Sequence, residues 1–173
     1  MNIFYLARDP REAARALHDK HIVKMCLETA QIMSTVAAEK ARGLVPLPRC
    51  YRPTHENHPC VKWARESFAN WVWLARHGKA IGEEYSHRFR GKVHASAEVI
   101  EGLAEWGEEN ALLWSSWTAT PPAQAMPEAY RREDPVEAYR AYYLKEKVHQ
   151  SRWTNAPVPE WVLTAWERKK ELA

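Results

Sequence analysis

Residues 18–31 (HDKHIVKMCLETAQ) form a helix-like stretch that is apolar over most of its circumference. A helix of that kind is buried, so other elements of the chain must pack around it. Yet His21, Lys24 and Glu28 follow one another at spacings of three and four, which places them on one stripe of the helix. Because burying unpaired charges is costly, we interpret the stripe as the lining of a pocket. A buried His–Lys–Glu network that only fixes helix packing is the structural alternative.

Helical signals continue along the rest of the chain. Asp9 can cap a helix with Pro10 at its first position, and we expect this helix to run to about Arg42, before Gly43. Further helices are expected over 59–78, 79–89, 92–106, 135–149 and 161–172. No segment shows the alternation of a strand. The sequence therefore predicts an all-α fold: a single domain over residues 1–173, with about five to six helices packed around a long first helix.

Composition narrows the class of protein. The chain has 173 residues, of which 46% are hydrophobic and 27% charged, enough for a real core in a globular domain. No apolar run approaches the roughly 20 residues of a membrane span, and no signal-peptide pattern opens the chain. Its three cysteines fit reduced thiols rather than a disulfide framework. We expect a monomeric cytoplasmic protein, in the host cytoplasm if a phage encodes it, with no membrane partner.

A polar loop precedes the helix expected at Pro59. A helix N-terminus presents free N–H groups and a partial positive charge, which suit a phosphate. A zinc site through Cys50, His55, His58 and Cys60 has a spacing unlike the usual ligand patterns, so no metal is expected. A capped, hydrogen-bonded loop without function is the other alternative. The candidate substrate-binding residues here are Arg52, His55, Asn57, His58, Lys62 and Arg65.

Basic residues also gather near aromatic ones in two later segments. A net charge of +3 is too small to establish nucleic-acid binding, but cations beside flat rings suit phosphate contacts and base stacking. The alternative is that the aromatic residues pack in the core and the charges are solvated. The candidates for DNA contact are Arg88, Lys92 and His94 in the first segment, and Arg140, Lys147 and Trp153 in the second.

Two segments of the chain resemble a known family. His21 precedes Glu28 by seven residues, the chain opens with the short apolar run MNIFYL, and Glu146-Lys147 is followed by Arg152-Trp153. In these features the chain resembles the bacteriophage pyrimidine-dimer DNA glycosylases, and it is similar to uncharacterised phage proteins with the same motifs. The resemblance covers about a quarter of the chain. Leu27 stands where the family has an arginine.

The resemblance implies an all-α enzyme that uses its N-terminal α-amine as nucleophile. The usual pKa of an α-amine is about 7.7, so a good share of such amines is neutral near pH 7. Met1 precedes Asn2 rather than a small residue, and if Met1 is retained its own amine would attack C1′ of the target nucleotide. Glu28 would stabilise the developing charge and move protons. His21 and Lys24 would orient Glu28 or hold a phosphate.

The resulting expectation is a DNA glycosylase, with AP-lyase activity, that excises a damaged or modified base without a cofactor. Met1, Glu28 and His21 are its candidate catalytic residues. Asn2 and Lys24 join the substrate-binding set. Two other classes stay open. One is a nucleotide or modified-base transferase or hydrolase that uses the loop of His55 and His58. The other is a non-enzymatic nucleic-acid-binding protein, in which Glu28 would be replaceable.

Overall fold

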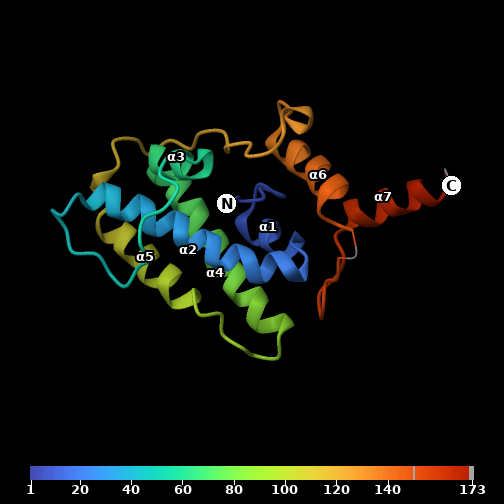
Figure 1. The fold of residues 1–173 in the computed structure, drawn as a ribbon, viewed down its shortest axis with the longest axis horizontal. Coiled ribbons are helices and arrows are strands. Elements are labelled where there is room, and N and C mark those ends of the chain that lie inside the picture. The colour runs from blue at the N-terminus through green and yellow to red at the C-terminus, as the bar shows by residue number, and fades with distance from the viewer. Residues whose placement is uncertain (150, 172–173) are drawn as a thin grey trace.

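The computed structural model describes residues 1–149 and 151–171, and within these ranges the chain is helical with no strand (Figure 1). The all-α prediction is confirmed, with more helices than expected. The α-helices are α1 (Pro10–Ala16), α2 (Asp19–Ala41), α3 (Pro59–Glu66), α4 (Phe68–Arg88), α5 (Ala97–Glu109), α6 (Pro135–Glu146) and α7 (Glu160–Glu171). Two short 3₁₀ turns, Ala111–Leu113 and Glu128–Tyr130, lie between α5 and α6.

The long first helix of the prediction is two helices. Asp9 caps α1 as expected, its carboxylate accepting from the backbone N–H groups of Arg11 and Glu12. The chain then becomes extended at Leu17 and His18, and His18 is the N-cap of α2. No glycine or proline marks this break, and the apolar residues keep their helical spacing across it. The sequence therefore predicted one continuous helix. The break lets α2 change direction and pass through the middle of the molecule (Figure 1).

The boundaries of the next helices also differ from the prediction. Ser67 is extended and caps α4, so the helix expected over 59–78 ends at Glu66. Gly78 does not end a helix, because it lies inside α4, where its missing side chain leaves room for Thr29 of α2. Helix α5 begins later than expected and α6 ends earlier. The expected end of the last helix at residue 172 lies outside the described residues.

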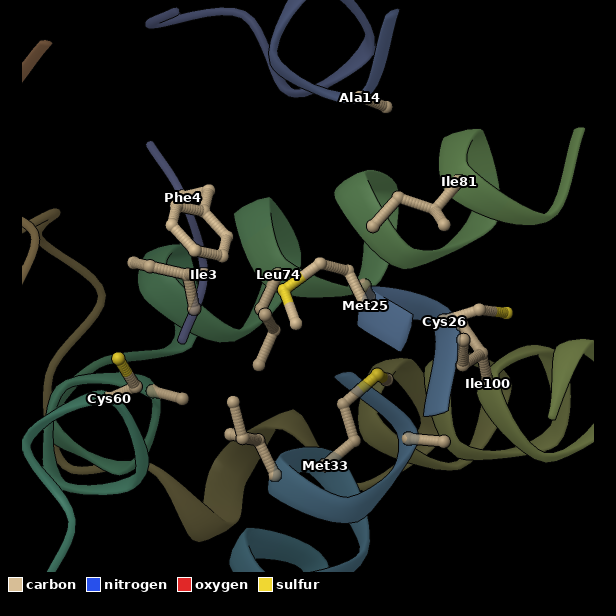
Figure 2. Packing of buried hydrophobic residues seen from close by; sticks show 14 of the residues in the cluster. Ile3, Phe4, Ala14, Met25, Cys26, Met33, Cys60, Leu74, Ile81 and Ile100 are labelled. Atoms are coloured by element: carbon tan, nitrogen blue, oxygen red, sulfur yellow. The ribbon is translucent and has the colours of Figure 1, made fainter. Parts of the chain in front are cut away.

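Helix α2 is the centre of the core, in contact with α3, α4 and α5. Its residues Met25, Cys26 and Met33 are almost fully buried, and Figure 2 shows them among side chains of the neighbouring helices. The N-terminal segment belongs to the same core, since Ile3 and Phe4 are buried there (Figure 2). The first residues of the chain are thus held by packing, which decides where the amine lies.

Helices α6 and α7 lie together at one end of the molecule (Figure 1). Tyr139 and Tyr143 of α6 are fully buried, so this helix packs its tyrosines inward. Val162 is the buried residue of α7. Within the described ranges, no helix combines the length and the hydropathy that crossing a bilayer requires.

Candidate active site

The N-terminal backbone meets a buried carboxylate on α2. Glu28 is only 8% exposed, and its Oε2 accepts a hydrogen bond of 2.9 Å from the backbone N–H of Asn2. The amine of Met1 lies 3.9 Å from the same oxygen. The other oxygen, Oε1, faces the Lys24 ammonium at 3.4 Å, one turn earlier on the helix. Positive and N–H groups therefore balance the charge of this carboxylate on both sides.

Asn2 locks the first residues in place. Its side-chain nitrogen donates to the carbonyl of Ala125 at 2.8 Å, and its side-chain oxygen accepts from the N–H groups of Ile3 and Phe4. Phe4 has a φ of +40°, a backbone conformation that residues other than glycine rarely adopt. Such strain persists only where the surroundings enforce it. The amine is thus positioned by a fixed turn and not by a free tail.

His21 lies in a stack of rings beside this turn. Its ring is stacked on Phe4 at 4.5 Å and on His18 at 4.1 Å, measured between ring centroids. Its Nδ1 is 2.9 Å from the hydroxyl of Tyr143, which also accepts from the backbone N–H of His18. The Tyr143 hydroxyl thus joins the His18 backbone to the His21 ring.

Burial lowers the pKa of His21 to about 3, with the charges of His18, Lys147 and Lys24 acting in the same direction. The imidazole is therefore neutral near pH 7. The hydrogen bond of the His21 ring runs to Tyr143 and not to Glu28, so Lys24 is the member of the predicted stripe that contacts the carboxylate. Lys24 and Glu28 of the stripe are therefore paired with each other, whereas His21 belongs to the stack of rings.

The polar loop before α3 runs beside α2. Thr54 and Thr35 exchange two hydrogen bonds through the Thr35 hydroxyl, and the Tyr51 N–H donates to the Ser34 hydroxyl. The loop ends at His58, which is the N-cap of α3. The Nδ1 of His58 accepts a hydrogen bond of 3.2 Å from the Cys60 N–H. Burial lowers the pKa of His58, and the charges of the N-terminal amine and of His55 act in the same direction.

Of the other candidates in and after this loop, all but Arg65 face solvent. Arg65 is half-buried and forms an ion pair with Glu39 of α2. Within the described residues, no group of three histidine, cysteine or acidic side chains converges as metal ligands do. The exposed members of the predicted set are Arg52, His55, Asn57 and Lys62.

Two of the predicted DNA contacts are corrected by their burial. Arg88 is 1% exposed, and its guanidinium donates to the carbonyls of Leu17 and Arg15 and to the carboxylates of Asp19 and Glu84. It fixes the break between α1 and α2 and cannot reach a phosphate.

Trp153 is 7% exposed, and its indole N–H donates to the Ala16 carbonyl. It packs edge-on against His18 and Trp166, so it is a core residue rather than a stacking platform. Residue type and spacing alone did not distinguish a buried tryptophan from an exposed one.

The remaining basic candidates are accessible. Arg140 donates to the Leu6 carbonyl at 2.8 Å and lies over the ring of Trp161. Lys147 lies over the ring of Tyr142 and near enough to His21 to lower its pKa. Lys92 is exposed in the turn between α4 and α5, where the half-buried His94 accepts from the Ser96 N–H.

Two partners of the site were missed by the sequence analysis. Tyr143 fixes His21, and the Ala125 carbonyl holds Asn2. Tyr139 and Tyr143 are four residues apart, which places them on one face of a helix but does not tell what their hydroxyls bind. A backbone carbonyl in an irregular segment leaves no signal in the sequence.

Comparison with known protein families finds a match over the N-terminal part of the chain, which carries Glu28. A family model described as pyrimidine dimer DNA glycosylase matches residues 1–97. The match includes the N-terminal segment, Glu28 and the loop of His58, and it ends before Tyr143 and Lys147. No curated protein and no solved structure matches the chain.

Proposed function

The chain belongs to the pyrimidine dimer DNA glycosylase family, which makes it a protein of the DNA glycosylase type, and we propose that it excises a damaged or modified base with its N-terminal amine as nucleophile. The observation that carries this proposal is the pairing of the buried Glu28 carboxylate with the first two backbone nitrogens, at 3.9 and 2.9 Å. An amine and a carboxylate held at one point are the two groups that this chemistry requires.

The reaction follows from these groups. The neutral amine attacks C1′, the bond from C1′ to the base breaks, and the base leaves with the bonding electrons and takes up a proton. The sugar ring then opens as O4′ gains a proton, which leaves an imine between C1′ and the amine. Glu28 stabilises the positive charge that develops at C1′ and carries protons between these atoms. Loss of a C2′ proton and of the 3′ phosphate completes the lyase step.

Either of two nitrogens can be the attacking amine. With Met1 retained, the amine lies 3.9 Å from Glu28 and is held by the Asn2 turn. With Met1 removed, the nitrogen of Asn2 becomes the amine, already 2.9 Å from the carboxylate. We propose Met1 as the attacking residue, because methionine before asparagine is expected to stay. An intact-mass measurement of the purified protein identifies the first residue.

DNA would approach across the exposed side of this site. The Lys24 side chain is 65% exposed although its ammonium faces Glu28, so it can also meet a phosphate. The charge of Lys147 also acts on this region, since it contributes to the lowered pKa of His21. Duplex DNA must release the target nucleotide from the stack before C1′ can reach an amine this deep. We propose that Arg52, Lys62 and Lys92, all exposed, add phosphate contacts that weaken as salt is raised.

Borohydride trapping on duplex DNA with one abasic site tests the mechanism without knowledge of the target base. The wild-type protein is expected to form a covalent adduct. Glu28→Gln is expected to lower the trapping rate by about 100-fold or more, the order that removal of one preorganised group costs. Glu105→Gln, an exposed glutamate of α5, is the matched control and should trap at the wild-type rate.

A removable leader tests the amine itself. A fusion that a protease cuts directly before Met1 should trap nothing when intact and regain trapping after cleavage. Trapping by the intact fusion would contradict the proposal. An activity on nucleotides that survives the leader but is lost in His55→Ala would instead support the transferase or hydrolase class.

A further inference from the structure

The N-terminal turn is held by a distant part of the chain, the irregular segment 121–127 that leads to α6 (Figure 1). In this segment the Ala125 carbonyl accepts a hydrogen bond of 2.8 Å from the side chain of Asn2. The backbone N–H of Asn2 donates to Glu28 at 2.9 Å, and the amine of Met1 lies 3.9 Å from the same carboxylate oxygen. The place of the amine therefore depends on where the segment 121–127 holds Asn2.

The Asn2 amide has one orientation that satisfies all of its partners. Its oxygen accepts from the N–H groups of Ile3 and Phe4, so its nitrogen is the atom that must find an acceptor elsewhere. Asn2 is buried, and a buried amide that loses its acceptor is costly. If the Ala125 carbonyl moves, the amide has to turn, and the turn that carries the amine moves with it.

One hydroxyl of α6 gives the segment 121–127 its shape. The Tyr139 hydroxyl donates to the Ala123 carbonyl at 2.6 Å and accepts from the Ala125 N–H at 3.3 Å. These backbone groups have no helix or strand to bond them, so the side chain takes that place. The N–H and the carbonyl of Ala125 flank a single Cα, and fixing the first limits where the second can point.

Tyr139 is well suited to hold a backbone in place. It is fully buried in α6, and burial raises its pKa, so the hydroxyl keeps the proton that it donates to Ala123. Its ring also packs edge-on against Phe4, at 6.3 Å between centroids, and Tyr143 does the same at 5.3 Å. Helix α6 thus contacts the N-terminal turn directly at Phe4 and indirectly through Ala125.

We propose, on the basis of the proposed function, that Tyr139 is a positioning residue for the nucleophile. Its hydroxyl fixes the backbone of the segment 121–127, the Ala125 carbonyl of that segment fixes Asn2, and Asn2 holds the N-terminal amine beside Glu28. Misplacing a reacting group by about 1 Å costs on the order of 100-fold in rate. Loss of the Tyr139 hydroxyl should therefore slow the chemical step and leave DNA binding nearly unchanged.

Tyr139→Phe removes the hydroxyl and keeps the ring. We expect the single-turnover rate of borohydride trapping on abasic duplex DNA to fall by about 10- to 100-fold. Binding to a duplex with a tetrahydrofuran abasic analogue should stay within about threefold of wild type. Gly107→Ala is the control for lost stability, because an added methyl overlaps Trp71 in the packing of α5 against α4. At a temperature where both variants are folded, Gly107→Ala should trap at the wild-type rate.

Two further measurements show whether Tyr139 acts through Asn2. Asn2→Leu removes the amide, so adding Tyr139→Phe to Asn2→Leu should slow trapping little further, whereas independent effects would multiply. In the wild-type protein, the ¹⁵N-labelled side-chain amide of Asn2 should exchange its hydrogens slowly with solvent, and in Tyr139→Phe faster. The wild-type spectrum tests the contact with Ala125 even if a variant fails to fold.

Different results overturn different claims. If the wild-type protein forms no adduct, the proposed function falls and the role of Tyr139 falls with it. If Tyr139→Phe traps at the wild-type rate, or if Gly107→Ala loses as much, the role of Tyr139 alone is overturned. Effects of Tyr139→Phe and Asn2→Leu that multiply, or a wild-type Asn2 amide that exchanges rapidly, also overturn this role and leave the proposed function standing.

Discussion

At the scale of residues, the site depends on a few side chains that each satisfy several partners. Glu28 receives the Asn2 N–H and faces two ammonium groups, which accounts for a carboxylate buried in an otherwise apolar helix. Tyr143 also has more than one partner, because its hydroxyl connects the His18 backbone to the His21 ring. A change to either residue leaves more than one buried polar group without a partner.

Tyr143→Phe tests this directly. The substitution removes only a hydroxyl, but it leaves the His18 N–H and the His21 Nδ1 unsatisfied in a buried site. We expect the free energy of unfolding to fall by about 1–3 kcal/mol, measured by urea denaturation. Tyr142→Phe, whose hydroxyl has no hydrogen bond among the described residues, is the control and should change it little. Equal stability of Tyr143→Phe and wild type would contradict the assignment.

At the scale of elements, the sequence predicted helix starts better than helix breaks. Three helices begin where the sequence predicted them, each with a capping side chain directly before a proline: Pro10, Pro59 and Pro135. The breaks at His18 and Ser67 interrupt helical periodicity without a glycine or proline, so they were missed. The sequence predicted that a helix ends at Gly78. The helix continues through Gly78, and a glycine is required there because Thr29 and Ile100 pack closely against it. The local sequence does not show which residues are constrained by tertiary packing.

Two glycines of α5 give a matched pair at this scale. A methyl group at Gly107 would overlap the indole of the buried Trp71 on α4, so Gly107→Ala should destabilise the protein by about 1–3 kcal/mol. At Gly102 the nearest atom to an added methyl is 3.6 Å away, on Pro48. Gly102→Ala should therefore be neutral or stabilising by up to about 1 kcal/mol, from helix propensity. Thermal unfolding of both variants distinguishes the two environments, and the same change in both would contradict this packing.

At the scale of the whole molecule, residues far apart in the chain complete the site. The stripe on α2 and the opening segment were identified from the sequence because their spacing is local. Their partners at Ala125 and Tyr143 come from more than 120 residues away from Asn2 and His21. The predictions that Arg88 and Trp153 contact DNA failed for the same reason, since burial depends on segments that the local pattern does not include.

The buried histidines give the molecule a pH-dependent stability. Burial lowers the pKa values of His18, His21 and His77 to about 4, 3 and 4, against 6.5 when unfolded. Between these values the unfolded chain binds more protons, so acid favours unfolding. The free energy of unfolding should be level near pH 7.5 and fall as pH drops below about 6.5, by up to about 1.4 kcal/mol per pH unit for each histidine. Urea denaturation at pH 7.5, 6 and 5 measures it, and a rise in stability toward pH 5 would contradict the neutral burial of these rings.

The role of the N-terminal amine is tested most directly by locating the DNA on the protein after borohydride trapping. The adduct formed with an abasic duplex is digested, and the peptide that carries the sugar is sequenced by mass spectrometry. Attachment to the α-nitrogen of the first residue is the expected result. Attachment to the side chain of Lys24, the other amine beside Glu28, or to any other lysine, would contradict it.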